Sequence, residues 1–278
     1  MPSMKTIKRR LTSVTTTKKI MKAMNMVAAS KLQKDRARLE AARPFFAETQ
    51  AVMDHLRSHR DAAPNAYFKS REINSRVYLI ISSDRGLCGS YNANLAQAAL
   101  AHMNESEASM KIIAVGLKGY DFFRRQDREI IEHCAIDNAS YADAQRIAEQ
   151  LAAMYNSGGA GEVYIAYTKY KSALLHLPQV ERILPFEKAK SEGPPMNFDC
   201  DIAAYIQQAV PVYLSAFVYT AMLESQACEQ AARMISMDTA VDNASDIAHD
   251  LTRAYNRRRQ AGITQEISEI VASTSVMK

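Results

Sequence analysis

Hydrophobic residues recur at helical spacing over a long C-terminal stretch, from about Val210 to Val271. Within this stretch only Gly262 interrupts a composition that helices tolerate, and no proline follows Pro211. We therefore expect one uninterrupted helix with Pro211 in its first turn, where the missing N–H costs little. The apolar positions include Leu214, Phe217, Ala221, Ile247, Leu251, Ala254, Ile263, Ile267 and Ile270.

A second long helix is predicted from Thr6 to about Arg60 by a seven-residue repeat of apolar positions. One series contains Ile7, Val14, Met21, Ala28, Ala42 and Leu56. The other series contains Leu11, Leu32, Leu39, Phe46 and Met53. Asp35 interrupts the first series, and Lys18 and Asn25 interrupt the second. Such a repeat indicates a coiled-coil seam.

The simplest arrangement pairs the two terminal helices in antiparallel orientation, as a shaft formed by residues 1–60 and 205–278. A helix of roughly 60 residues is on the order of 90 Å long. A compact domain of this chain length has a radius of gyration of only about 19 Å. We therefore expect the shaft to project from the remainder of the chain.

Residues 75–190 alternate between strand and helix patterns, which is typical of an α/β domain with a parallel sheet. The predicted strands are Val77–Ser83, Lys111–Gly116, Glu129–Cys134, Glu162–Tyr170 and a returning strand within Leu174–Pro185. The predicted helices are Ala93–Met103, Lys118–Gln126 and Ala142–Tyr155. A loop over Lys188–Phe198 and a short helix over Asp199–Gln208 follow. The predicted fold is thus α/β: a long antiparallel coiled coil of N- and C-terminal helices with an inserted Rossmann-like domain.

The net charge of +5 is concentrated in two basic clusters, within residues 1–43 and at Arg253 and Arg257–Arg259. A basic shaft could bind nucleic acid, an anionic membrane surface or an acidic protein sleeve. Because the chain has no tryptophan and no nucleic-acid recognition motif, we expect no sequence-specific reading of nucleic acid. No apolar run approaches the length that crosses a bilayer. Four cysteines without CxxC spacing, Cys88, Cys134, Cys200 and Cys228, suit a reducing compartment without a zinc site.

The turn DRGLCGSYN, Asp84–Asn92, follows a strand and precedes a helix, where α/β sheets bind phosphates. A nucleotide site would use Gly86, Gly89 and the backbone amides. Because neither GxGxxG nor GxxxxGK[ST] is present, a tight turn that requires glycine is the stronger interpretation. Cys88 could be a nucleophile at a helix N-terminus, but a small buried residue is the simpler interpretation.

Other candidate sites are weaker. His55 and His59 have the spacing of a metal-ligand pair on a helix, but no third ligand is evident. Asp84 and Glu162 could form an acid pair, although nothing in the sequence brings them together. We therefore expect no catalytic residue, no cofactor and no metal. Gln260, Thr264 and Glu266 form a stripe of hydrogen-bonding groups, which is either a contact surface or a solvated face.

Three segments carry a family resemblance. They are IKRRLTSVTTTKKIMKAMNMVAASKL (Ile7–Leu32), SSDRGLCGSYN (Ser82–Asn92) and the run from EQAARMISMDTAVDNA to LTRAYNRRRQAGITQEISEIV (Glu229–Val271). Together they resemble the gamma subunit of F-type ATP synthase, and the resemblance covers essentially the whole chain. The tail Ser273–Lys278 has no recognisable match.

The resemblance implies a rotor subunit without catalytic residues. Its shaft would enter a hexamer of alternating alpha and beta subunits, and its foot would attach to the epsilon subunit and the membrane c-ring. Ion-driven rotation would then cycle the beta subunits through ATP synthesis. The implied location is the cytoplasmic face of a bacterial plasma membrane, peripheral and held there through the complex, or alternatively the matrix side of the mitochondrial inner membrane.

Particular residues match the motifs of that family. Gln260, Thr264 and Glu266 match QAxITxE and would meet the beta-subunit loops that hold the shaft. Arg233 would lie at a lower beta-subunit contact, and Met24 would face the beta subunit. The remaining matches are the basic start of the shaft, Lys8, Arg9 and Arg10, and the turn glycines, Gly86 and Gly89.

Two other classes of function stay open on the residues alone. An enzyme built on the α/β insert would bind nucleotide through residues 75–190. A basic coiled-coil adaptor would bind nucleic acid or lipid in a strongly salt-dependent way.

Overall fold

The computed structural model describes residues 3–59, 65–69, 74–135, 138–187 and 201–276. The predicted loop Lys188–Phe198 and Cys200 lie outside the described residues. In chain order the elements are α1 (Met4–Ser58), η2 (Ala66–Phe68), β1 (Ser75–Ile81), α2 (Tyr91–Met103), β2 (Ser109–Val115), α3 (Leu117–Arg124), β3 (Glu129–Cys134), α4 (Tyr141–Asn156), β4 (Glu162–Tyr170), β5 (His176–Leu184) and α5 (Ile202–Val276).

The chain divides into two compact units. The helical unit contains residues 1–28 and 234–278, and the α/β unit contains residues 29–233. Helices α1 and α5 each contribute to both units.

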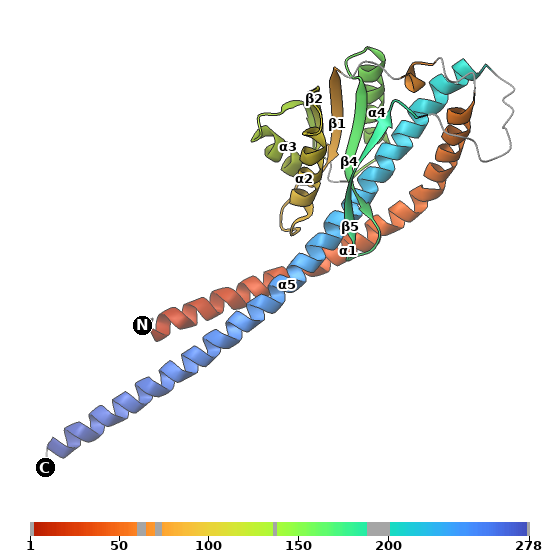
Figure 1. The fold of residues 1–278 in the computed structure, drawn as a ribbon. Coiled ribbons are helices and arrows are strands. Elements are labelled where there is room, and N and C mark those ends of the chain that lie inside the picture. Colours follow the sequence, from red (N-terminus) through yellow and green to blue (C-terminus); the bar gives the residue numbers. More distant parts are fainter. Residues whose placement is uncertain (1–2, 60–64, 70–73, 136–137, 188–200, 277–278) are drawn as a thin grey trace. The chain divides into compact units, whose positions relative to one another are not determined.

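Five strands form one sheet in the α/β unit, in the order β3-β2-β1-β4-β5 (Figure 1). Strands β1 to β4 pair in parallel, and β5 returns antiparallel to β4. In the register, Tyr78 of β1 lies between Ile112 of β2 and Tyr164 of β4. The predicted strand order along the chain is confirmed, and β3 and β4 have the predicted bounds.

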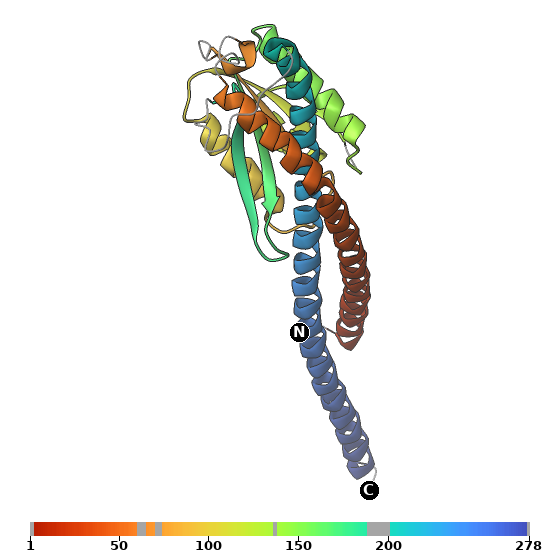
Figure 2. The same cartoon turned by 90° about the vertical axis from the view of Figure 1, so that its right-hand side faces the viewer.

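Both faces of this sheet are covered by helices, which is why its central strands read as continuous apolar runs. On one face, α4 and the neighbouring parts of α1 and α5 pack against alternate residues of β1, such as Val77 and Leu79. On the other face, α2 and α3 pack against Tyr78 and Ile80 (Figure 2). Because β1, β2 and β4 are parallel, their carboxyl ends lie together at the same end of the sheet.

In the helical unit, α1 and α5 run in opposite directions (Figure 1). Ile7 and Ala28 of α1 and Met237 and Ala244 of α5 are buried. Along the whole of α1, the predicted heptad positions are the covered ones, and this includes the polar interruptions at Lys18, Asn25 and Asp35. The predicted antiparallel coiled-coil fold is thus confirmed.

One prediction about α5 is wrong. The helix begins at Ile202 and contains Pro211 in its interior, so the described part of the predicted short helix over Asp199–Gln208 is the start of the same element. Proline removes the hydrogen bond to the carbonyl four residues earlier. Packing of Ile206, Val210 and Leu214 into the core, where all three are fully buried, offsets that loss.

A second expectation about α5 also needs correction. Within Ile202–Val271, an 18-residue window has a mean hydropathy of 1.2, which meets the length and composition of a membrane-spanning helix. In the α/β unit, however, Leu214, Val218 and Met222 of α5 are buried in the core that covers the sheet. The apolar character there is that of a core helix.

Candidate functional site

The turn between β1 and α2 is closed by its own side chains. Ser83 donates its backbone N–H to Asn92 Oδ1 at 3.1 Å, and Asn92 Nδ2 donates to Cys88 Sγ at 3.2 Å. Two residues of the turn have left-handed backbone angles, Leu87 with φ 64° and Gly89 with φ 57°. Gly89 therefore adopts a left-handed backbone conformation, which glycine reaches without strain. Gly86 has no left-handed angle, because in this part of the turn that angle is adopted by Leu87.

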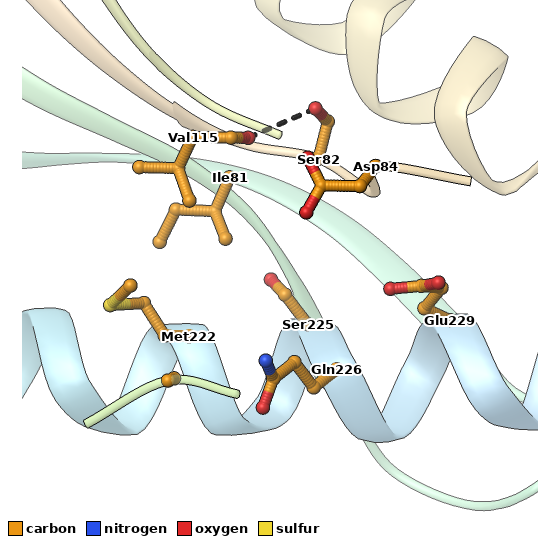
Figure 3. Close-up of a pocket in the computed structure, with 9 residues that line it drawn as sticks. Ile81, Ser82, Asp84, Val115, Met222, Ser225, Gln226 and Glu229 are labelled. Carbon is orange, nitrogen blue, oxygen red and sulfur yellow. Dashed lines mark hydrogen bonds between the residues drawn. The ribbon is translucent and has the colours of Figure 1, made fainter. Parts of the chain in front are cut away.

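A small cavity lies between this turn and α5 (Figure 3). Its polar lining includes Ser82, Asp84, Ser225, Gln226 and Glu229. The volume is about 20 Å³, which accommodates a water molecule and is far too small for a nucleotide. The geometry therefore favours the structural interpretation of the turn over the nucleotide site.

Cys88 belongs to this turn, and its side chain is buried in a cluster with Tyr91 and Cys228. Burial raises the pKa of the Cys88 thiol, whereas a nucleophilic cysteine needs a lowered pKa. Cys88 thus has the properties of a small core residue.

Arg233 connects α5 to the β1–α2 turn. Its guanidinium donates to Glu229 Oε1 at 2.6 Å, to Gln230 Oε1 at 3.0 Å and to the backbone carbonyl of Gly86 at 3.3 Å. Only 10% of the Arg233 side chain is exposed. Burial raises the pKa of Glu229, and the charge and hydrogen bond of Arg233 act in the opposite direction.

The weaker candidates do not assemble. Glu162 lies at the start of β4 and pairs with Arg76 at 2.8 Å, whereas Asp84 lies beyond the opposite end of β1. Because β1 and β4 are parallel, the two acids are at opposite edges of the sheet. His55 is in the last turn of α1, and His59 follows the end of that helix. Among the described residues, no group of three His, Cys, Asp or Glu side chains could hold a metal ion.

The last part of α5 is exposed on all sides. Asn25 Nδ2 of α1 donates to the Met234 carbonyl of α5 at 2.9 Å. Because α1 begins at Met4, antiparallel pairing from this point places the start of α1 opposite about residue 255. Tyr255 is indeed half-buried, and every residue over 256–271 is exposed. Within the helical unit, α5 therefore continues as a single helix beyond its partner.

The sequence-predicted contact residues lie on this exposed segment. Gln260, Thr264 and Glu266 are all exposed, and Thr264 Oγ1 donates to the Gln260 carbonyl at 3.0 Å. Beside them runs an apolar stripe, Ile263, Ile267 and Ile270, with exposed fractions of 48% to 63%. The spacing of these isoleucines by itself predicts ordinary helix-packing positions. The length of the N-terminal helix could have identified them as exposed positions, because that helix is too short to cover them.

The remaining predicted residues lie on α1 in the helical unit. Lys8, Arg9 and Arg10 are exposed on the first turns of the helix. Met24 is half-buried, one residue before the asparagine that bonds to α5.

Comparisons with known proteins match this chain over its full length to one family. Residues 3–277 match the family described as ATP synthase. The ATP synthase gamma chain of Moorella thermoacetica is 39% identical over 282 residues, with 100% of both chains covered. That of Desulfitobacterium hafniense is 38% identical over 281 residues, again with 100% of both chains covered.

Solved structures agree as well. A chain of the central stalk and c-ring structure from Tetrahymena thermophila mitochondrial ATP synthase is 27% identical, with a TM-score of 0.63, and the match covers 80% of this chain and 99% of that one. A chain of the Euglena gracilis mitochondrial enzyme has a TM-score of 0.72 at 18% identity over 99% of this chain and 94% of that one, which supports the fold. With a full-length family match, close full-length relatives and a shared fold, this chain belongs to the ATP synthase gamma-chain family, as a central-stalk rotor subunit and not the catalytic subunit.

Proposed function

We propose that the chain transmits torque between the c-ring and the alpha–beta hexamer of its ATP synthase, by inserting the exposed end of α5 into the hexamer. The observation that supports this most is the single-helix segment over residues 256–271. An isolated helix of this length is marginally stable in water, and its exposed isoleucine stripe gains stability only against an apolar surface. A surrounding protein sleeve supplies both requirements.

Within that sleeve, Gln260, Thr264 and Glu266 would hydrogen-bond with the beta-subunit loops that hold the shaft. Ile263, Ile267 and Ile270 would contact the apolar wall. Each rotational position then has unequal affinity for the conformations of the three beta subunits. A ligand with such differential affinity shifts the populations of those conformations, and this is how rotation drives nucleotide binding and ATP release.

On α1, Met24 and the basic residues Lys8, Arg9 and Arg10 would face neighbouring subunits of the hexamer. Arg233 differs from them, because its guanidinium is already bonded within the chain. We propose that it contributes to the lower contact with the beta subunit indirectly.

The shaft would comprise residues 1–60 and 205–278, and the α/β domain residues 75–190. That domain would attach near the foot to the epsilon subunit and to the c-ring. The complex would lie on the cytoplasmic face of a bacterial plasma membrane, with the matrix side of the mitochondrial inner membrane as the alternative. The chain would be peripheral to the membrane and would bind no nucleic acid.

The test is reconstitution of the full chain with its alpha and beta subunits. We expect co-purification of the three subunits and ATP hydrolysis by the complex, with no hydrolysis by the chain alone. Isothermal titration of the lone chain with ATP should show no binding. Nucleotide binding by the lone chain, or a failure to associate with alpha and beta subunits, would contradict the proposal. Salt-dependent binding to DNA or anionic vesicles would favour the basic-adaptor alternative.

A further inference from the structure

A series of hydrogen bonds joins α5 to the carboxyl edge of the sheet. The Tyr91 hydroxyl of α2 donates to the Ser225 carbonyl at 3.1 Å, and the Thr168 amide of β4 donates to Ser225 Oγ at 3.3 Å. One turn further along α5, Cys228 Sγ donates to the Thr168 carbonyl at 3.5 Å. Arg233 ends the series with its bond to Gly86, and it is also the last residue of α5 in the α/β unit.

We propose that Arg233 is a positioning residue that acts inside the chain: with Glu229 it clamps the β1–α2 turn to α5, so that torque passes between the sheet and the helix. This inference rests on the proposed function. A helix exchanges torque with a neighbouring sheet only through lateral contacts, and the Arg233–Glu229–Gly86 clamp lies where α5 leaves the α/β unit.

The chemistry of the clamp suits this role. Guanidinium presents several donors in a rigid plane, and here they reach a carboxylate, an amide oxygen and a backbone carbonyl. With 10% and 15% of the two side chains exposed, Arg233 and Glu229 form a largely buried ion pair. Removal of one partner from such a pair leaves an uncompensated charge, which costs more than removal of both.

The turn held by this clamp carries backbone strain. Leu87 adopts φ 64° and remains exposed, a conformation that a side chain other than glycine rarely adopts. The bond from Arg233 to the preceding Gly86 carbonyl stabilises that conformation. Loss of the clamp should therefore loosen the turn and expose the buried side chain of Cys88.

The first test separates an internal clamp from a direct contact with another subunit. Reconstituted complexes would carry Arg233→Ala, Glu229→Gln or both, and ATP-driven ion pumping would be measured relative to ATP hydrolysis. We expect R233A to lower this ratio. The double variant should recover only the part due to the unpaired Glu229 carboxylate, because the Gly86 carbonyl still lacks its donor. If Arg233 instead bonded a partner subunit, Glu229→Gln would give no recovery, and that result would overturn the clamp.

Glu40→Gln is the matched control, because it breaks an ion pair and leaves Arg36 over the Tyr170 ring. Arg36 and Glu40 form the same i,i+4 pair on α1, but with 52% and 62% of their side chains exposed. Exposed pairs of this kind contribute little, so the pumping ratio should be unchanged. A ratio lowered equally by E40Q and R233A would also count against the clamp.

The second test uses the full chain alone. The rate of Cys88 modification by N-ethylmaleimide, followed by peptide mass mapping, reports opening of the turn. We expect R233A to raise this rate by at least about tenfold. The double variant should stay above the parent rate, because the Gly86 carbonyl still lacks its donor. An unchanged rate in R233A would overturn the clamp. A raised rate in a chain that does not associate with alpha and beta subunits would contradict the proposed function and leave the clamp intact. If R233A fails to fold, the same comparison is made with Arg233→Met.

Discussion

Asn25 of α1 donates a 2.9 Å hydrogen bond to the backbone carbonyl of Met234 of α5. Asn25 occupies a seam position of the seven-residue repeat, where its amide is half-buried. A single polar residue at such a position fixes the register of paired helices at some cost in stability. The bond therefore determines which residues of α5 extend beyond the start of α1.

Two replacements of Asn25 should distinguish its effect on the stability of the helix pair from its effect on the register between α1 and α5. Asn25→Ala removes the bond and should lower the free energy of unfolding by about 1 kcal/mol, measured by urea denaturation followed by circular dichroism. Asn25→Leu fills the seam and should restore stability. Distance distributions between spin labels on the two helices should broaden in N25L, because the register is no longer fixed. A single narrow distribution would contradict this role, and exposed Ser30→Ala is the control.

Replacement of both Gln260 and Thr264 with alanine should lower the ATPase rate of the reconstituted complex by at least about fivefold. This factor corresponds to a coupling free energy of about 1 kcal/mol, at the lower end of the usual range. Both side chains are exposed, so the circular dichroism spectrum of the isolated chain should not change. Thr252→Ala is the matched control, because Thr252 is exposed on the same helix and likewise bonds the carbonyl four residues earlier. Unchanged turnover in the double variant would argue against the contact.

Two glycine-to-alanine changes should have opposite effects. Gly116 has φ 92°, and a Cβ there would overlap the backbone carbonyl of Ser82, so Gly116→Ala should cost on the order of 3 kcal/mol. Gly262 lies in α5, where an added methyl group would meet no neighbouring atom, so Gly262→Ala should stabilise the local helix by about 1 kcal/mol. Denaturant unfolding measures the first change and amide hydrogen exchange over 256–266 the second. Faster exchange in G262A would contradict this expectation.

The stability of the α/β unit should depend on the protonation of Glu224. This carboxyl is buried, and burial raises its pKa above the ordinary value of 4.5. Lys169, the backbone of Tyr170 and Arg43 act against this shift, whereas Glu181 adds to it. Because the folded state then binds more protons than the unfolded state, stability should fall as pH rises from about 4.5 through the raised pKa.

Glu224→Gln removes this titration. Among the described residues Glu224 Oε2 has no hydrogen-bond partner, so the uncharged amide loses little. We expect the variant to be more stable than the parent at pH 7 and to show a flatter dependence of stability on pH. Unfolding titrations between pH 4 and pH 8 measure both. A steeper pH dependence in E224Q, or lower stability at pH 7, would contradict the assignment.

Local periodicity was sufficient for much of the fold. The seven-residue repeat predicted the covered face of α1 and even placed the polar residues Lys18, Asn25 and Asp35 on that face. Apolar runs bounded by turn residues predicted the five strands and their order along the chain. These features are encoded in neighbouring residues, because the spacing of apolar residues determines which side of a helix or strand is apolar. The terminal motifs likewise indicated the family, which full-length comparison supports.

Tertiary structure decided the features that depend on residues far apart in sequence. Pro211 lies within α5 and not at its start, because packing on the sheet outweighs one lost backbone bond. Asp84 and Glu162 lie at opposite edges of the sheet, because parallel pairing of β1 and β4 sets their positions. Arg233 reaches Gly86, 147 positions away, only because α5 crosses the turn after β1. Spacing along the chain shows which face of a helix or strand is apolar. It does not show whether another element covers that face, as at Ile263 and Ile267, or which distant group a buried side chain meets.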